Sequence, residues 1–79
     1  MFDYGDLVKF KEDAEDIWLN YKSADEWNEL LFKFNISPED LQFEEYEIAY
    51  VYDDGVYVKV TERNYHYMCT IPTEVLEHV

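Results

Sequence analysis

The stretch EYEIAYVYDDGVYVKV, residues 45–60, most constrains what this chain can fold into. Two runs of aromatic and β-branched residues, which favour extended backbone, flank Asp53, Asp54 and Gly55. An Asp-Gly pair between two such runs indicates a hairpin, because glycine accepts the positive φ of a primed turn. The stretch therefore predicts two antiparallel strands joined at Asp53–Gly55.

Alternation assigns the side chains of this hairpin to faces, since successive residues of a strand point to opposite sides. The sets expected to share a face within their own strand are Tyr46, Ile48, Tyr50 and Tyr52 in the first strand, and Val56, Val58 and Val60 in the second.

Three further strands are expected. GDLVKFK (Gly5–Lys11) alternates and contains a β-branched residue, so it predicts an opening strand. YHYMCT (Tyr65–Thr70) predicts the third strand of a meander, which ends at Pro72 because proline cannot donate to a ladder. A short turn and a last strand follow around Val75–Val79.

The clearest helix is SADEWNELLFKFN (Ser23–Asn35). Ser23 followed by Glu26 three residues later forms a capping box, and Asn35 suits the C-terminal end. One apolar stripe with helical spacing contains Trp27, Leu30, Leu31 and Phe34. The preceding segment, Glu12–Asn20, is compatible either with one or two helical turns or with a loop anchored by Trp18. SPED (Ser37–Asp40) predicts a turn or the start of one short helical turn.

The chain has 79 residues, which suits a single domain spanning residues 1–79. Domains this small are marginally stable unless large side chains fill the core. Aromatic residues make up 19% of the chain and are expected to form that core. They are Phe2, Phe10, Trp18, Trp27, Phe32, Phe34, Phe43 and eight tyrosines.

These elements resemble a small SH3-like barrel protein of the bacterial and phage type. The resemblance covers about half the chain. The motifs that carry it are strand and turn patterns, which many folds share. It is carried by GDLVKFK, EYEIAYVYDDGVYVKV, YHYMC and IPTEVLEHV. The predicted fold is mainly β with a helical insert (α+β), either an SH3-like small barrel or an antiparallel meander packed against one helix. The region 12–43 departs from the SH3 pattern, since a helix replaces the usual irregular loop.

Charge excludes several partners. Nineteen acidic residues oppose six basic ones, for a net charge of −13. Direct binding of nucleic acid requires a basic surface, and so does binding to an anionic membrane, so neither is expected. The single cysteine, Cys69, cannot form an internal disulfide, and no basic-then-apolar segment opens the chain. These features predict a cytoplasmic protein.

The sequence offers no catalytic or metal site. Cys69 and His66 lie three residues apart in an expected strand, where their side chains would point to opposite faces. One cysteine and two histidines do not supply the spacing of a zinc site, and no calcium-loop or phosphate-loop pattern is present. We therefore expect no enzyme activity, no metal and no cofactor.

The acidic residues are the candidate binding site. The positions expected to contact a partner are Glu12, Asp13, Glu15, Asp16, Glu44, Glu45, Glu47, Asp53 and Asp54. Asp25, Glu26 and Glu29 form a further acidic cluster. The net charge exceeds the roughly 2 to 8 units that solubility needs in a small domain.

Two functions fit this acidity. In the first, the chain mimics DNA and inhibits a basic, nucleic-acid-binding protein. In composition it resembles phage anti-restriction and anti-CRISPR proteins and uracil-DNA glycosylase inhibitors. In the second, the chain is an SH3-like protein–protein interaction module whose acidity serves only solvation and whose contact surface is a tyrosine-rich sheet face.

Overall fold

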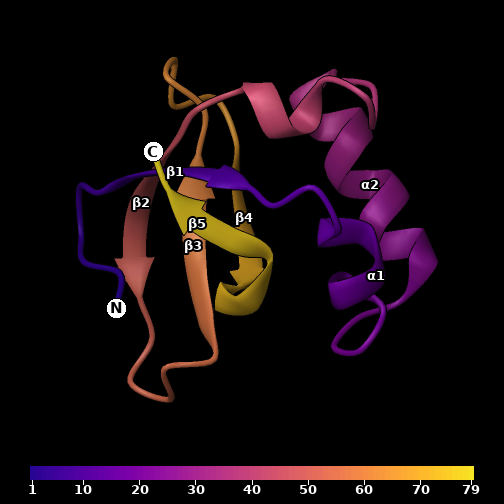
Figure 1. Cartoon of the computed structure of the whole chain (residues 1–79). Coiled ribbons are helices and arrows are strands. Elements are labelled where there is room, and N and C mark those ends of the chain that lie inside the picture. Colours follow the sequence, from indigo (N-terminus) through magenta and orange to yellow (C-terminus); the bar gives the residue numbers. More distant parts are fainter.

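The computed structural model describes residues 1–79 and places five strands in one antiparallel sheet with two helices beside it (Figure 1). The strands lie in the order β4-β3-β2-β1-β5. No backbone pairing joins the edge strands β4 and β5, so the sheet stays open and does not close into a barrel. The elements are β1 (Leu7–Phe10), α1 (Ala14–Trp18), α2 (Ala24–Phe34), the 3₁₀ turn η1 (Leu41–Phe43), β2 (Tyr46–Val51), β3 (Tyr57–Thr61), β4 (Met68–Pro72), the 3₁₀ turn η2 (Thr73–Val75) and β5 (Leu76–His78).

The capping box of α2 is confirmed. The Ser23 hydroxyl accepts a hydrogen bond from the Glu26 backbone N–H, and the Glu26 carboxylate accepts one from the Ser23 N–H. Asn35 ends the helix in the left-handed conformation at φ 52°. The expected apolar stripe faces the sheet, with Trp27 and Leu30 buried and the other two members partly buried against the core.

The segment Glu12–Asn20 contains the short helix α1, which was one of its two expected forms. Trp18, at the end of α1, is 2% exposed and its indole N–H donates to the Ser23 carbonyl at 3.1 Å. This bond links the end of α1 to the start of α2. Neither helix has the length and apolar character that crossing a bilayer needs.

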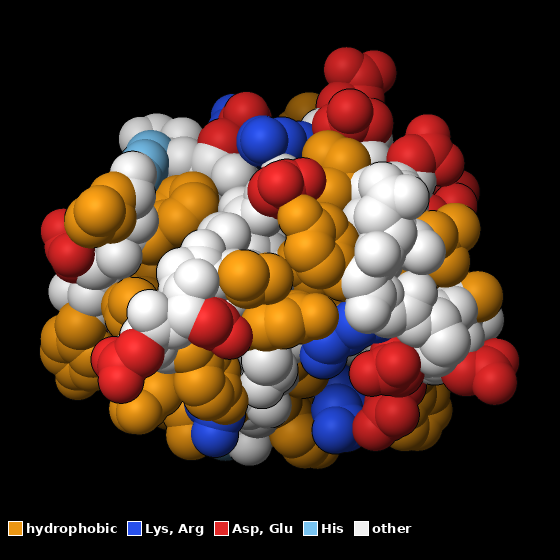
Figure 2. Space-filling view, turned by 90° about the horizontal axis from the view of Figure 1, so that it is seen from below, with side chains coloured by type: hydrophobic (Ala, Val, Ile, Leu, Met, Phe, Trp, Pro, Cys, Tyr) orange, Lys and Arg blue, Asp and Glu red, His pale blue; other side chains and the backbone are white.

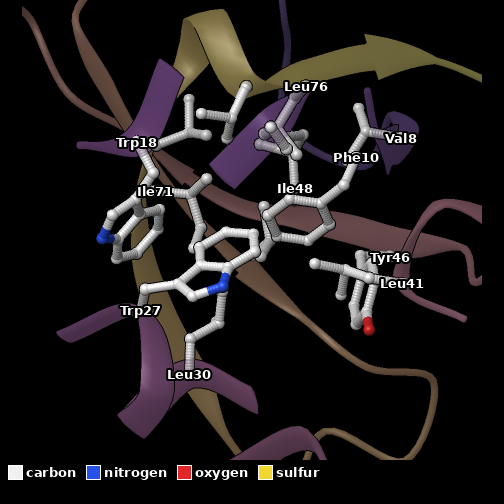
Figure 3. Close-up of a cluster of buried hydrophobic side chains, with 14 residues drawn as sticks. Val8, Phe10, Trp18, Trp27, Leu30, Leu41, Tyr46, Ile48, Ile71 and Leu76 are labelled. Carbon is white, nitrogen blue, oxygen red and sulfur yellow. The ribbon is translucent and has the colours of Figure 1, made fainter. Parts of the chain in front are cut away.

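The core lies between the helices and the sheet (Figure 3). The ring of Phe10 from β1 meets both Trp27 and Tyr46 edge to face, with centroids 6.3 Å and 5.5 Å apart. Three elements that are distant in sequence therefore share one aromatic cluster. Fourteen buried hydrophobic residues form this single core.

The expected hairpin turn at Asp53–Gly55 is confirmed, but it is wider than a two-residue turn. Tyr52 to Val56 separate the two strands, and Gly55 has φ 71° while neither aspartate has a positive φ. The Asp54 carboxylate accepts hydrogen bonds from the N–H groups of Val56 and Tyr57. A five-residue connection with a single left-handed glycine replaces the primed turn.

The shared face predicted for β2 holds only for its first half. The register shifts between Ile48 and Tyr50, where a bulge inserts one extra residue. Tyr46 and Ile48 are buried, whereas Tyr50 pairs with Lys59 and is 54% exposed. The expectation that Tyr50 shares a face with Ile48 was wrong, because the bulge turns it to the outer side.

The strand predicted from Tyr65 begins only at Met68. Tyr65 has φ 58°, a left-handed conformation that ends regular strand geometry. His66 therefore lies in the β3–β4 turn and not in a strand beside Cys69. The later part of the prediction is confirmed, since β4 ends at Pro72 and β5 follows η2.

Fewer aromatic residues lie in the core than the composition predicted. Phe10, Trp18, Trp27 and Tyr46 are buried, and Phe2 and Phe34 are partly buried against the core. Phe32 is 85% exposed and Phe43 is 75% exposed. Four tyrosines are also exposed: Tyr4, Tyr50, Tyr65 and Tyr67.

Candidate binding site on the acidic surface

The first predicted acidic cluster lies around the start of α1. Glu12 and Asp13 precede the helix, and Glu15 and Asp16 occupy its first turn, where the helix dipole favours carboxylates. All four side chains are exposed. They lie on the side of the molecule where α1 packs beside the sheet (Figure 1).

Part of this cluster lines a hollow of about 330 Å³ with residues that the sequence did not connect to it. Glu12 and Glu15 line it together with Glu39, which comes from the turn before η1. Trp27 and Lys11 also line the hollow. The sequence missed Glu39 because its approach depends on the fold of the whole α2–η1 connection.

The second predicted cluster is divided by the structure. Glu44 and Glu45 line a hollow of about 460 Å³ together with Glu62. Glu47, two residues further along β2, does not line it and accepts a hydrogen bond from the Tyr65 hydroxyl. The sequence missed Glu62, which reaches this place because Glu47 pairs with Thr61 across the β2–β3 ladder.

The predicted pair Asp53 and Asp54 lies apart from both clusters. The hairpin loop that contains them is at the opposite end of the sheet from η1 and the β3–β4 turn (Figure 1). Both side chains are exposed, but the Asp54 carboxylate is engaged in capping the loop. The structure therefore distributes the predicted site residues over three separate places.

Few of the carboxylates are paired with a cation. The ion pairs are Lys9–Glu77, Lys22–Glu26, Lys33–Glu29, Arg63–Glu45 and His78–Asp6. These involve five of the nineteen acidic residues, which leaves fourteen carboxylates without an ion pair. Figure 2 shows acidic side chains spread around the rim of one face, with hydrophobic side chains between them.

The hollow of about 460 Å³ lies between the C-terminal end of α2, the η1–β2 link and the β3–β4 turn. The rings of Phe34 and Tyr46 form part of it and lie 4.9 Å apart. Arg63 in the β3–β4 turn pairs with Glu45 at 3.8 Å and is 80% exposed in its side chain. Burial raises the pKa of the Tyr46 phenol, and the negative charges of Glu44 and Glu62 raise it further. The hollow is therefore a negatively charged environment with a neutral phenol.

Two lysines lie over β4, where the hollow beside α2 contains Cys69. Lys22 donates to the Thr70 carbonyl at 3.0 Å, and Lys33 pairs with Glu29 at 3.1 Å. Burial raises the pKa of the Cys69 thiol, an effect that these lysines partly oppose. A thiol in this state is a poor nucleophile at neutral pH. No group of three or more His, Cys, Asp or Glu side chains is arranged to hold a metal ion.

Comparison with protein families, curated proteins and solved structures finds no match to this chain.

Proposed function

We propose that this chain is a non-enzymatic acidic binding protein that mimics DNA and inhibits a basic, nucleic-acid-binding protein. The observation that carries the proposal is the set of fourteen carboxylates without an ion pair on a chain of net charge −13. DNA presents about one negative charge per 1.7 Å of its axis, and proteins that bind it carry a complementary basic surface. An acidic body of the right shape competes for that surface.

The carboxylates lie on or beside elements that the fold holds in place, and this supports the proposal. The cluster around α1 is tied to α2 through the bond from Trp18 to Ser23. Glu44 and Glu45 lie between η1 and β2, both of which contribute to the core. Charges held in fixed positions bind a complementary surface with a smaller loss of entropy than charges on a disordered tail.

The proposed class is that of phage anti-restriction or anti-CRISPR proteins, with a basic partner and no direct contact to nucleic acid. We place the protein in the cytoplasm, because its single cysteine is a free thiol, which suits a reducing compartment. For the fold, we propose an open relative of the SH3-like barrel. In support, every segment that carries the sequence resemblance contributes a strand to the one sheet.

A second candidate function is an SH3-like protein–protein interaction module, and the tyrosines on the outer face of the sheet favour it. Tyr50 and Tyr52 meet edge to face at 4.9 Å, and Tyr50 is 54% exposed. The Tyr52 hydroxyl lies 3.4 Å from the Thr70 hydroxyl of β4. In this alternative the aromatic face makes the contact and the carboxylates serve only solvation.

Neutralising one cluster at a time tests the proposal. One variant replaces Glu12, Asp13, Glu15 and Asp16 with Gln or Asn, and another replaces Glu44, Glu45 and Glu47 with Gln. Charge is removed while shape is nearly kept. The partner is a protein recovered at low salt. If the surface mimics phosphates, at least one variant should lose more than about tenfold in affinity for this partner, because several charge-assisted contacts are lost together.

The matched control is Tyr50→Ala, which leaves every carboxylate in place. It should not change binding if the carboxylates make the contact. Should Tyr50→Ala abolish binding while both neutralised variants bind as the unmodified chain does, the interaction module replaces the mimic.

A further inference from the structure

The hollow of about 460 Å³ beside the C-terminal end of α2 contains a polar group that the fold leaves unused. Tyr46 is 3% exposed and lines this hollow. Its hydroxyl takes part in none of the side-chain hydrogen bonds, whereas those of Tyr52 and Tyr65 do. Figure 3 shows the Tyr46 oxygen pointing away from the aromatic cluster. Trp27 Nε1 is the only enclosed side-chain N or O atom without a partner, so the Tyr46 oxygen is not enclosed and opens onto the hollow. A hydroxyl that has no partner in the chain and opens onto a hollow can bond a ligand atom there.

The charges around the hollow indicate the sign of that ligand. The Glu44 carboxylate lines the hollow and has neither an ion pair nor a hydrogen bond within the chain. Glu62 lines it from the other side, and its carboxylate is fixed by the backbone N–H groups of His66 and Tyr67. Two carboxylates beside a neutral phenol favour a cation.

A residue of the chain itself, Arg63, indicates which kind of cation this hollow accepts. Arg63 lines the hollow, and its guanidinium lies 3.8 Å from the Glu45 carboxylate. This pair is largely exposed, and exposed ion pairs contribute little to stability. The place therefore accepts a guanidinium without holding its own tightly.

An exposed aromatic ring beside the hollow also favours a guanidinium. Phe43 lines the hollow and is 75% exposed, although nothing in the core requires a phenylalanine there. A flat guanidinium stacks on an aromatic ring while its N–H groups donate to carboxylates in the same plane. A lysine ammonium lacks this planar, multiple-donor geometry.

We propose that this hollow binds the guanidinium of an arginine side chain on the basic partner. The inference rests on the proposed function and names how the partner is recognised. The arginine donates to the carboxylates of Glu44 and Glu62 and to the Tyr46 hydroxyl oxygen, and it stacks on Phe43. Arg63 occupies the same region in the free protein and is displaced.

A six-arginine peptide with acetylated and amidated ends is the probe, and a six-lysine peptide of equal charge is its comparison. Binding to the full chain is measured at low salt by calorimetry and by NMR shift mapping. We expect shifts at residues 34–36, 43–46 and 62–64, and affinity for the arginine peptide at least about threefold higher than for the lysine peptide.

Three variants define the site. Glu44→Gln should weaken arginine-peptide binding by about tenfold, and Tyr46→Phe by about threefold to tenfold while the ring still fills the core. Arg63→Gln should strengthen binding by about twofold to threefold, because a competing cation is removed. The matched control is Asp53→Asn, which makes the same charge change at the far hairpin loop and should leave the affinity within about twofold.

Equal losses for Glu44→Gln and Asp53→Asn, or equal affinities for the two peptides, would overturn the arginine site. Shifts confined to the cluster around α1 would also overturn it and leave the acidic mimic standing. If neither peptide binds anywhere at low salt, the arginine site and the proposed function fail together.

Discussion

The indole rings of Trp18 and Trp27 meet edge to face with their centroids 5.3 Å apart. One ring comes from α1 and the other from α2, and both side chains are buried. Because Trp27 also contacts Phe10 of β1, this pair attaches both helices to the sheet. The position of the acidic cluster on α1 therefore depends on the contact between these two rings.

Trp27→Ala should lower the free energy of unfolding by about 3 to 5 kcal/mol, because it leaves a cavity where the two helices meet. Trp27→Phe is the control. It should lower the free energy of unfolding by less than Trp27→Ala does. The phenyl ring keeps part of the packing, and the change also removes the indole Nε1–H, which is buried without a hydrogen-bond partner. Urea unfolding followed by circular dichroism measures both. An unchanged midpoint for Trp27→Ala would mean that this residue does not support the core.

Thr61→Val should lower the free energy of unfolding by about 1 to 3 kcal/mol, although the side chain keeps its shape. Thr61 is 0% exposed, and its hydroxyl donates to the Tyr67 carbonyl at 2.8 Å. Valine removes this donor from the base of the β3–β4 turn. Thr73→Val is the matched control, because the hydroxyl of Thr73 donates to the Val56 carbonyl at an exposed place where water can substitute. Similar losses for the two variants in urea unfolding would contradict the assigned role of Thr61.

Gly55→Val should lower the free energy of unfolding by about 1 to 2 kcal/mol through backbone conformation alone. Gly55 has φ 71°, and an added Cβ would meet no atom within 4 Å, so crowding contributes nothing. Gly55→Asn should cost less, since asparagine tolerates the left-handed region. Thermal melts of the two variants and of the unmodified chain measure these losses of stability. Equal melting temperatures for Gly55→Val and the unmodified chain would mean that the hairpin loop has another conformation.

Cys69 should react slowly with a thiol reagent such as 5,5′-dithiobis(2-nitrobenzoate). Burial raises the pKa of its thiol, so the thiolate fraction at neutral pH is smaller than in an unfolded chain. The rate should increase as the pH rises and reach half of its maximum at a higher pH than in the urea-unfolded protein. Stopped-flow absorbance gives both profiles. Superimposable profiles would show that the fold does not protect this thiol.

The elements with local determinants could be predicted from the sequence. Ser23 and Glu26 form the start of α2 through contacts within four residues, and Asn35 ends the same helix. The turn at Asp53–Gly55 was found for the same reason, since glycine at that place tolerates a positive φ. These features depend on neighbours in the chain and need no knowledge of tertiary packing.

The rest depends on contacts that no local pattern contains. The bulge between Ile48 and Tyr50 reverses the face of the later residues of β2, and Tyr65 delays the start of β4. Phe32 lies off the apolar stripe of α2, so its hydrophobicity did not mean burial. Glu62 joins Glu44 only through the pairing of β2 with β3, which local sequence does not reveal.

The measurement that tests the central claim most directly is recovery of a nucleic-acid-binding protein by the immobilised chain, with salt and nucleic acid as variables. The chain is incubated with a cell lysate at about 50 mM and about 500 mM salt, with and without added double-stranded DNA or RNA. We predict that a basic, nucleic-acid-binding protein is retained at low salt, and that either high salt or the nucleic acid releases it. Retention that persists at high salt and in the presence of nucleic acid would contradict the mimic, because an aromatic contact responds little to either.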